Sequence, residues 1–213
     1  MSYANIIFDV DGTLTDSRHD IAGAQLRVLH RLGVDHVKEE DLYPFIGRRL
    51  EETFRRLLPS ELHAAIPGAA TMYLEEYLPR ALETTTLFPG VSDTLAELRS
   101  RGKLLAVAST KRSTTIRRVT DHFGITGHFV QLQGTDNLPH KPDPAIITKI
   151  LTDQGWIPRE TLMVGDTDLD MRAGRGAGTA TCGVTYGALT AAQLRLLEPD
   201  HLITHFSELL AFA

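Results

Sequence analysis

The chain has a single cysteine, Cys182, among its 213 residues. One thiol rules out an intrachain disulfide and a zinc site built from several cysteines. The sequence has no run of about 18 consecutive apolar residues, the minimum that a transmembrane helix needs. Its first residues also lack the basic start and apolar core of a signal peptide. We therefore expect no membrane segment and a cytoplasmic location.

Positive charge is also scarce. The chain has 22 Lys and Arg against 27 Asp and Glu, a net charge of −5, and no long basic run. Nucleic-acid binding typically needs a basic surface that neutralises phosphates, so we expect no nucleic-acid partner. Hydrophobic residues make up 42% and charged residues 23%, which is the balance of a globular protein rather than a disordered one. This length is enough for one core and an inserted subdomain.

The first candidate site lies near the start of the chain. A short apolar run ends in Asp9 and Asp11, two aspartates one residue apart, and the chain then turns at Gly12. Side chains alternate along a strand, so both carboxylates point the same way if the backbone stays extended. Two like charges at one strand end repel each other and need compensation, most simply by a divalent cation. The plainer alternative is an acidic turn, because aspartate and glycine are common turn residues.

A helical region follows this motif. Apolar residues recur with helical spacing from Ile21 to Leu32, after the good helix N-caps Asp16 and Ser17. No alternating strand pattern appears between residues 16 and 82. We therefore predict an inserted all-helical cap domain over residues 16–82. Its further helical segments are expected at Asp41–Phe45, Leu50–Leu58 and Glu61–Leu82, with interruptions at Pro44-Phe45-Ile46-Gly47, Pro59 and Pro67-Gly68.

From Phe88 onward, helical and strand patterns alternate. Such alternation is typical of a doubly wound, mainly parallel sheet that binds its ligands at the carboxyl ends of the strands. Residues 1–15 and 83–213 are predicted to form this Rossmann-like α/β core domain. Strands are expected at Lys103–Ala108, Phe129–Gln133, Leu162–Val164, Thr179–Val184 and Leu202–Ile203, and helices at Val91–Arg101, Ser113–Phe123, Pro142–Gln154, Asp170–Ala177, Thr190–Leu196 and Phe206–Ala211.

Residues able to bind phosphate or metal recur after the predicted strands. Ser109 follows the second strand, Lys141 lies in a loop stiffened by two prolines, and Asp166 follows a later strand, with Asp170 four positions on. These strand ends share one edge of a parallel sheet, so the side chains can converge on one site. Each residue taken singly also has a plainer interpretation. Ser109 could begin a helix, and Lys141 could be a solvated surface lysine. The aspartates of 166–170 could be the acidic start of a helix.

In their order along the chain, these motifs resemble those of the haloacid dehalogenase-like (HAD) phosphohydrolases. The family's first motif, Asp-x-Asp-Gly-Thr, matches residues 9–13, and its later motifs match Ser109, Lys141 and Gly165-Asp166-x-x-x-Asp170. The segments 140–144 and 163–167, and a helical cap between the first and second motifs, are particularly similar to the phosphoglycolate phosphatase branch. The resemblance covers essentially the whole chain.

The resemblance implies a nucleophile, an acid/base and a metal site. Asp9 is the expected nucleophile on phosphorus, and Asp11 is the expected general acid and base. A Mg²⁺ ion is expected on the carboxylates of Asp9 and Asp166 and the backbone carbonyl of Asp11, with waters completing its octahedron. Such an ion offsets the repulsion between the attacking carboxylate and the phosphoryl oxygens.

Other residues are expected to support this chemistry. Lys141 neutralises Asp9 and the phosphoryl oxygens, while Ser109, Thr110 and backbone N–H groups bind the remaining oxygens. Asp170 is expected to orient Lys141 or metal-bound water from behind the metal ligands. Asp168 is expected to face solvent.

Substrate choice is expected to lie with the cap, which closes over the site and excludes water. Gly47 and Arg48 are candidate contacts, because an arginine fork suits a carboxylate or a second phosphate. The alternative is that Arg48 and Arg49 are the solvated start of an amphipathic helix. The expected partner is a small-molecule phosphate ester, with 2-phosphoglycolate first by resemblance and sugar phosphates, nucleotides and pyrophosphate as alternatives. The oligomeric state is not predicted.

Other activities of the superfamily fit the sequence less well. Dehalogenases carry no acid/base aspartate at the position of Asp11. Enzymes similar to β-phosphoglucomutase usually have Glu-Asp in place of Gly165-Asp166, and a histidine in place of Ile21. A phosphonatase needs a cap lysine, and the one available, Lys38, lies in a charged stretch. An inorganic pyrophosphatase stays an alternative. A non-catalytic binding module, from a different class of protein, would be favoured by a lost motif residue, and none is lost.

Overall fold

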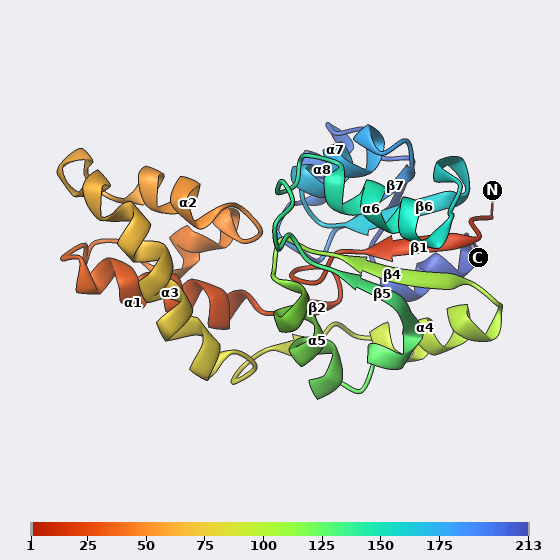
Figure 1. The fold of residues 1–213 in the computed structure, drawn as a ribbon, viewed down its shortest axis with the longest axis horizontal. Helices are drawn as coiled ribbons and strands as arrows, with labels where there is room; N and C mark the ends of the chain where they lie inside the picture. The colour runs from red at the N-terminus through yellow and green to blue at the C-terminus, as the bar shows by residue number, and fades with distance from the viewer. Residues whose placement is uncertain (1, 213) are drawn as a thin grey trace. The chain divides into compact units, whose positions relative to one another are not determined.

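The computed structural model describes residues 2–212. The chain forms two compact units, one made of the residues up to Asp16 and from Leu87 onward, and the other of Ser17–Thr86 (Figure 1). The units divide after residues 16 and 86, whereas the sequence predicts boundaries after residues 15 and 82. That the helical unit acts as a cap stays a prediction.

The larger unit is built on a parallel sheet with the strand order β5-β4-β1-β6-β7-β8. Ile6 of the central strand pairs with Leu105 on one side and Leu162 on the other. Strand β1 therefore lies where the strand order reverses, which is the place where such sheets bind ligands. The strands are β1 (Asn5–Phe8), β4 (Leu104–Ala108), β5 (Phe129–Gln133), β6 (Thr161–Gly165), β7 (Ala180–Val184) and β8 (His201–Ile203).

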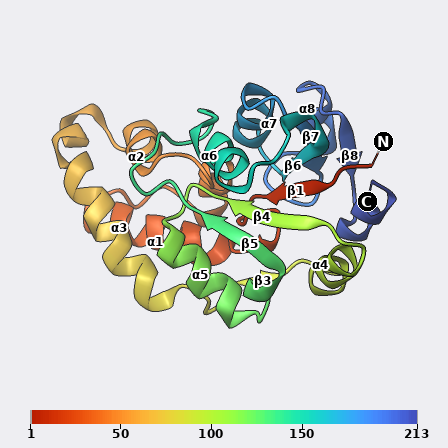
Figure 2. The same ribbon diagram turned by 45° about the vertical axis from the view of Figure 1, so that its right-hand side comes forward.

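Helices cover both faces of this sheet, with α6 and α7 on one face and α4 and α5 on the other (Figures 1 and 2). On the first face, Ile7 and Met163 from the strands pack in one buried cluster with Ile146 and Ile150 of α6. The fold is thus the doubly wound, Rossmann-like α/β class that the sequence predicts. The helices are α4 (Val91–Ser100), α5 (Ser113–His122), α6 (Ala145–Gln154), α7 (Asp168–Gly176) and α8 (Ala191–Arg195), and a 3-10 turn, η5 (Phe206–Ala211), follows β8.

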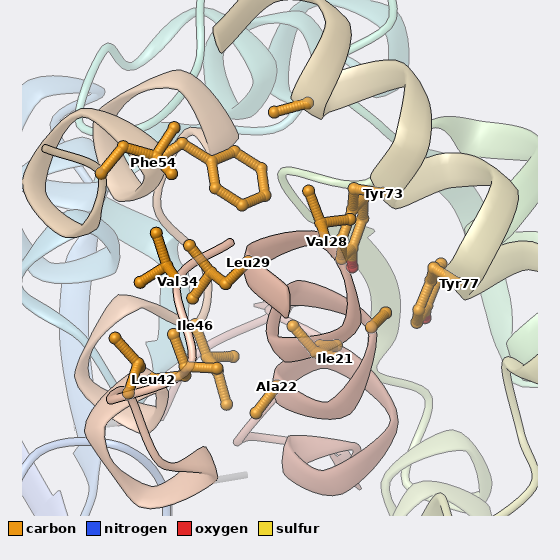
Figure 3. Close-up of a cluster of buried hydrophobic side chains, with 14 of the residues drawn as sticks. Ile21, Ala22, Val28, Leu29, Val34, Leu42, Ile46, Phe54, Tyr73 and Tyr77 are labelled. Atoms are coloured by element: carbon orange, nitrogen blue, oxygen red, sulfur yellow. The ribbon is translucent and has the colours of Figure 1, made fainter. Parts of the chain in front are cut away.

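The smaller unit consists of helices and 3-10 turns around its own apolar core. Phe54 and Leu42 are fully buried there, in a cluster with Val28 and Leu29 of the first helix (Figure 3). Its elements are α1 (Arg18–Arg31), η1 (Glu39–Phe45), α2 (Leu50–Leu57), η2 (Ser60–Ala65) and α3 (Ile66–Arg80). Across residues 2–212, no helix combines the length and apolarity needed to cross a membrane.

Proline accounts for the main difference from the predicted helices. The segment expected at Glu61–Leu82, with an interruption at Pro67-Gly68, is a 3-10 turn followed by α3, which begins at Ile66 with Pro67 in its first turn. A proline fits there because the first helical N–H groups have no partner within the helix. Two short strands were not predicted, β2 (Thr15–Asp16) and β3 (Thr86–Leu87), which pair with each other. A strand of two residues is too short to show the alternation of apolar and polar residues by which strands are predicted.

Asp20 holds the chain at the end of the helical unit. Its buried carboxylate accepts hydrogen bonds from the backbone N–H of Leu82 at 3.0 Å and of Thr85 at 3.0 Å, and from the hydroxyls of Thr84 at 2.7 Å and Thr85 at 2.6 Å. Burial by itself raises the pKa of Asp20, but the bonds from Thr84 and Thr85 outweigh it and lower the pKa below its ordinary value. Leu82 has a φ of 81°, a left-handed conformation that a leucine adopts only under such constraint.

We expect the Asp20→Ala variant to destabilise the helical unit by about 2 kcal/mol or more, because it leaves several N–H and O–H donors without their charged acceptor. The lowered pKa means that this stabilisation is present above the ordinary aspartate pKa of about 3.9 and is lost as the pH falls through the lower, folded-state value. Urea denaturation and hydrogen exchange of the amides of residues 82–85 measure it. Asp35→Ala, at an exposed aspartate of the same unit, is the control. Equal stability of the two variants at pH 7 would contradict the assignment.

Candidate active site

The ends of β1, β4 and β6 place three of the predicted residues at one edge of the sheet. The backbone N–H of Asp9 donates to Val164 at 2.9 Å, which continues the pairing of β1 with β6 by one residue. The backbone N–H of Ser109 donates to Gln133 at 3.0 Å beside the end of β5. Asp166 directly follows β6. The strand ends therefore bring Asp9, Ser109 and Asp166 to the same edge, as the parallel topology requires.

Lys141 reaches this edge from the loop between β5 and α6. Its side chain is buried, and its Nζ lies 2.6 Å from Asp9 Oδ1, 2.5 Å from Asp170 Oδ1 and 2.9 Å from the carbonyl oxygen of Ala108. Burial lowers the pKa of Lys141, but the pairing with Asp170 and Asp9 outweighs it and raises the pKa above its ordinary value. The lysine is a buried cation held by two carboxylates and is not a solvated surface residue.

Asp170 is fixed on both of its oxygens. Besides the bond from Lys141 to Oδ1, Oδ2 accepts hydrogen bonds from the backbone N–H of Thr167 at 3.1 Å and its hydroxyl at 2.5 Å, in a capping box that begins α7. A Cβ atom on Gly165 would lie 2.3 Å from Asp170 Cγ, so only glycine permits this approach. Asp170 is therefore both the acidic start of a helix and the partner of Lys141. Asp168, in the same first turn, is half-buried.

Asp166 is enclosed by the turn after β1 and the loop after β7. Its Oδ2 accepts a hydrogen bond from the backbone N–H of Ala188 at 2.7 Å, and its Oδ1 accepts one from the Thr13 hydroxyl at 3.3 Å. Gly12 has a φ of 83°, and a Cβ atom there would lie 2.1 Å from Asp166 Oδ2. Gly12 is thus required twice, for its left-handed backbone and for the close approach of the carboxylate.

The site carries more buried negative than positive charge. Asp9, Asp166 and Asp170 each offer a carboxylate oxygen within 4.8 Å of the others, and all three residues are buried. Burial, Asp170 and Asp11 raise the pKa of Asp9 to about 7 although Lys141 opposes them. Burial, Asp170 and Asp9 also raise the pKa of Asp166 well above its ordinary value, against the Ala188 N–H and Lys141. Closely spaced carboxylates that repel one another suit a hard divalent cation such as Mg²⁺.

Sequence reasoning did not single out Lys111, which pairs with Asp11. The Lys111 Nζ lies 3.0 Å from Asp11 Oδ2, and both side chains are largely buried. The backbone of Lys111 is fixed by a hydrogen bond, which its carbonyl oxygen accepts from the N–H of Thr135 at 2.9 Å. Its position two residues after Ser109, at the end of a strand, is the one signal in the sequence that points to it.

The remaining predicted residues lie in different units, Ser109 and Thr110 in the larger one and Gly47 and Arg48 in the helical one. Ser109 is fully buried, and its hydroxyl accepts a hydrogen bond from the backbone N–H of Lys111 at 3.3 Å. It does not begin α5, which starts at Ser113. Thr110 follows it at the same strand end and is half-buried. Gly47 and Arg48 belong to the helical unit, where Arg48 Nη1 lies 3.9 Å from Glu52 Oε1, and their contact with substrate stays a prediction.

The sequence matches the model of the haloacid dehalogenase-like hydrolase family over residues 6–184. It is 34% identical to a pyrophosphatase, PpaX, of Bacillus velezensis, covering 96% of this chain and 94% of that protein. It is 31% identical to a phosphoglycolate phosphatase of Aquifex aeolicus, covering 96% and 93%. A solved haloacid dehalogenase-like protein from Streptococcus pneumoniae superimposes with a TM-score of 0.90 at 28% identity, covering 99% and 98%. The chain belongs to the haloacid dehalogenase-like hydrolases.

We expect Asp166→Asn to raise the melting temperature of the metal-free protein by a few degrees at pH 8, and by much less near pH 4. The pKa of Asp166 is higher in the folded than in the unfolded protein, so its ionisation disfavours folding, and this cost grows as the pH rises above the unfolded-state pKa of about 3.9. Differential scanning calorimetry in EDTA at the two pH values measures the shift. Asp153→Asn is the control, because hydrogen bonds from Lys149 and Gln131 lower the pKa of that carboxyl. A variant less stable than wild type at pH 8 would contradict the expectation.

Proposed function

We propose that this protein is a Mg²⁺-dependent phosphatase that hydrolyses a small phosphate monoester through an aspartyl-phosphate intermediate on Asp9. The observation that carries the proposal is the buried cluster in which Lys141 joins Asp9 to Asp170, beside Asp166, at the carboxyl edge of the sheet. Membership of the haloacid dehalogenase-like hydrolases and the similarity to phosphatases support it.

The donor set fits a Mg²⁺ ion on Asp9 and Asp166. Asp9 accepts the hydrogen bond from Lys141 on Oδ1, and we assign its Oδ2 to the ion. Asp170 has Oδ1 on the Lys141 ammonium and Oδ2 on two donors of Thr167, so we assign it to orienting Lys141 rather than to the ion. Each oxygen of Asp166 accepts one neutral donor and keeps a lone pair for the ion. The backbone carbonyl of Asp11 is the third protein ligand in this proposal. When bound, Mg²⁺ supplies the positive charge that offsets the repulsion between the carboxylate and the phosphoryl oxygens.

The residues of the chain then perform the two steps of hydrolysis. A carboxylate oxygen of Asp9 forms a bond to phosphorus while the ester P–O bond breaks, and Asp11 donates its proton to the leaving oxygen. Asp11 next takes a proton from water, whose oxygen displaces Asp9 and releases inorganic phosphate. Lys141 holds the carboxylate of Asp9 in place and neutralises charge on the phosphoryl group, and Ser109 and Thr110 bind its remaining oxygens.

Two of the relatives suggest substrates that can be compared directly. One is named a phosphoglycolate phosphatase and another a pyrophosphatase, and both cover nearly the whole chain. We place 2-phosphoglycolate first, pyrophosphate second and sugar phosphates third, with the helical unit acting as the cap that selects among them. A small-molecule substrate in the cytoplasm stays a prediction from the sequence.

We expect the Asp9→Asn variant to lose at least about a thousandfold in phosphate release, because an amide cannot attack phosphorus. The measurement is Mg²⁺-dependent phosphate release from 2-phosphoglycolate, pyrophosphate, sugar phosphates and nucleotides. Asp93→Asn, at an exposed aspartate on α4, is the matched control and should retain wild-type activity. If the wild-type protein releases phosphate from none of these with Mg²⁺, the catalytic proposal is wrong and a non-catalytic binding module is favoured.

We expect Arg48→Ala to raise KM about tenfold or more for a substrate with a second anionic group, with a smaller effect on kcat, because it removes a charge-assisted contact to a part of the substrate that does not react. Arg56→Ala is a close control, since Arg56, on α2, also has its Nη2 3.9 Å from Glu52 Oε1. Steady-state kinetics on 2-phosphoglycolate compare the two. Equal KM values for the two variants would show that Arg48 does not contact the substrate.

A further inference from the structure

The loop after β7 lies directly against Asp166. The backbone N–H of Ala188 donates to Asp166 Oδ2 at 2.7 Å, and the N–H of Leu189 lies 3.4 Å from the Asp166 carbonyl oxygen. A charged carboxylate that accepts a backbone N–H is fixed in orientation more firmly than a solvated one. The loop therefore holds both the side chain and the main chain of one residue of the buried carboxylate cluster.

Gly187 makes this close approach possible. A Cβ atom at residue 187 would lie 2.3 Å from Asp166 Cβ, 2.5 Å from Asp166 Oδ2 and 2.4 Å from the carbonyl oxygen of Gly12. Its φ lies outside the left-handed region, so the position requires glycine for space rather than for backbone conformation. Because one of the contacts is to a backbone oxygen, a methyl group cannot be accommodated by a side-chain rotation alone.

Tyr186 fastens the same loop to the turn after β1. Its hydroxyl donates to the carbonyl oxygen of Thr13 at 3.1 Å, and its ring packs against Phe88 with centroids 4.5 Å apart. Burial, with Asp166 and Cys182, raises the pKa of Tyr186, so its hydroxyl keeps its proton and donates. Thr13 in turn donates its side-chain hydroxyl to Asp166 Oδ1 at 3.3 Å. The two loops thus hold Asp166 between them, and each of them binds a different oxygen of its carboxylate.

We propose that Gly187 is a positioning residue for the metal site, because its missing side chain lets the loop 186–189 clamp the carboxylate of Asp166 in the orientation that binds Mg²⁺. This inference rests on the proposed function, in which Asp166 is a metal ligand. Groups that orient metal ligands from behind contribute about 10–100-fold to metal affinity. A methyl group at residue 187 pushes the loop and Asp166 apart and disturbs the ligand without removing it.

The test compares Mg²⁺ binding by isothermal titration calorimetry for wild type, Gly187→Ala and Gly127→Ala. Gly127 is the matched control, because a Cβ atom there meets nothing within 4 Å and its φ is also outside the left-handed region. We expect Gly187→Ala to bind Mg²⁺ about 10–100-fold more weakly, whereas Gly127→Ala binds like wild type. We also expect excess Mg²⁺ to restore most of kcat in Gly187→Ala, which a general loss of structure would not allow.

Tyr186→Phe keeps the test decisive if Gly187→Ala does not fold. It retains the ring on Phe88 and removes the bond to Thr13, and we expect about fivefold weaker Mg²⁺ binding from the loss of one hydrogen bond. Wild-type Mg²⁺ affinity in Gly187→Ala, or in Tyr186→Phe if that variant alone folds, would overturn the inference and leave the proposed function intact. Absence of Mg²⁺ binding and of turnover in the wild-type protein would overturn both.

Discussion

Two ion pairs to one buried lysine organise the core of this protein. Lys141 lies between Asp9 and Asp170 with almost no exposure to solvent. Moving a charged amine out of water costs several kcal/mol unless carboxylates and hydrogen bonds surround it. The residues that surround it come from the ends of β1 and β4 and from the start of α7, so the lysine ties three separate parts of the chain to one point.

The pairing leaves a negative charge that the fold does not neutralise by itself. Asp166 stands beside the paired carboxylates, and its pKa is raised by burial and by its neighbours. A site intended for stability alone would place an apolar residue there. In the proposed function this carboxylate is a binding position for a cation, and the glycines at 12 and 187 keep the backbone close around it.

Much of the fold was predictable, because it depends on patterns that short segments carry. The apolar run before Asp9 predicts a buried strand, and alternation with helices predicts parallel strands whose carboxyl ends share one edge. That rule predicts that Ser109 and Asp166 lie at one edge. Helical spacing predicted the segment Glu61–Leu82 less accurately, because Pro67 marks a helix start there rather than an interruption. These patterns did not identify Lys111, because the sequence does not show which carboxylate a lysine will pair with in the folded protein.

The sequence by itself determined which residues stand at the strand ends, since hydrophobic periodicity and the positions of Asp, Ser and Lys are properties of the chain. The tertiary structure decided which charges pair and how closely the backbone surrounds them. Lys141 has Asp9 and Asp170 within reach, while Lys111 has Asp11. Gly187 touches Asp166 across about twenty residues of chain, at distances where one methyl group does not fit. Such contacts depend on differences of less than 1 Å, about the scale at which packing acts, and no local pattern in the sequence records them.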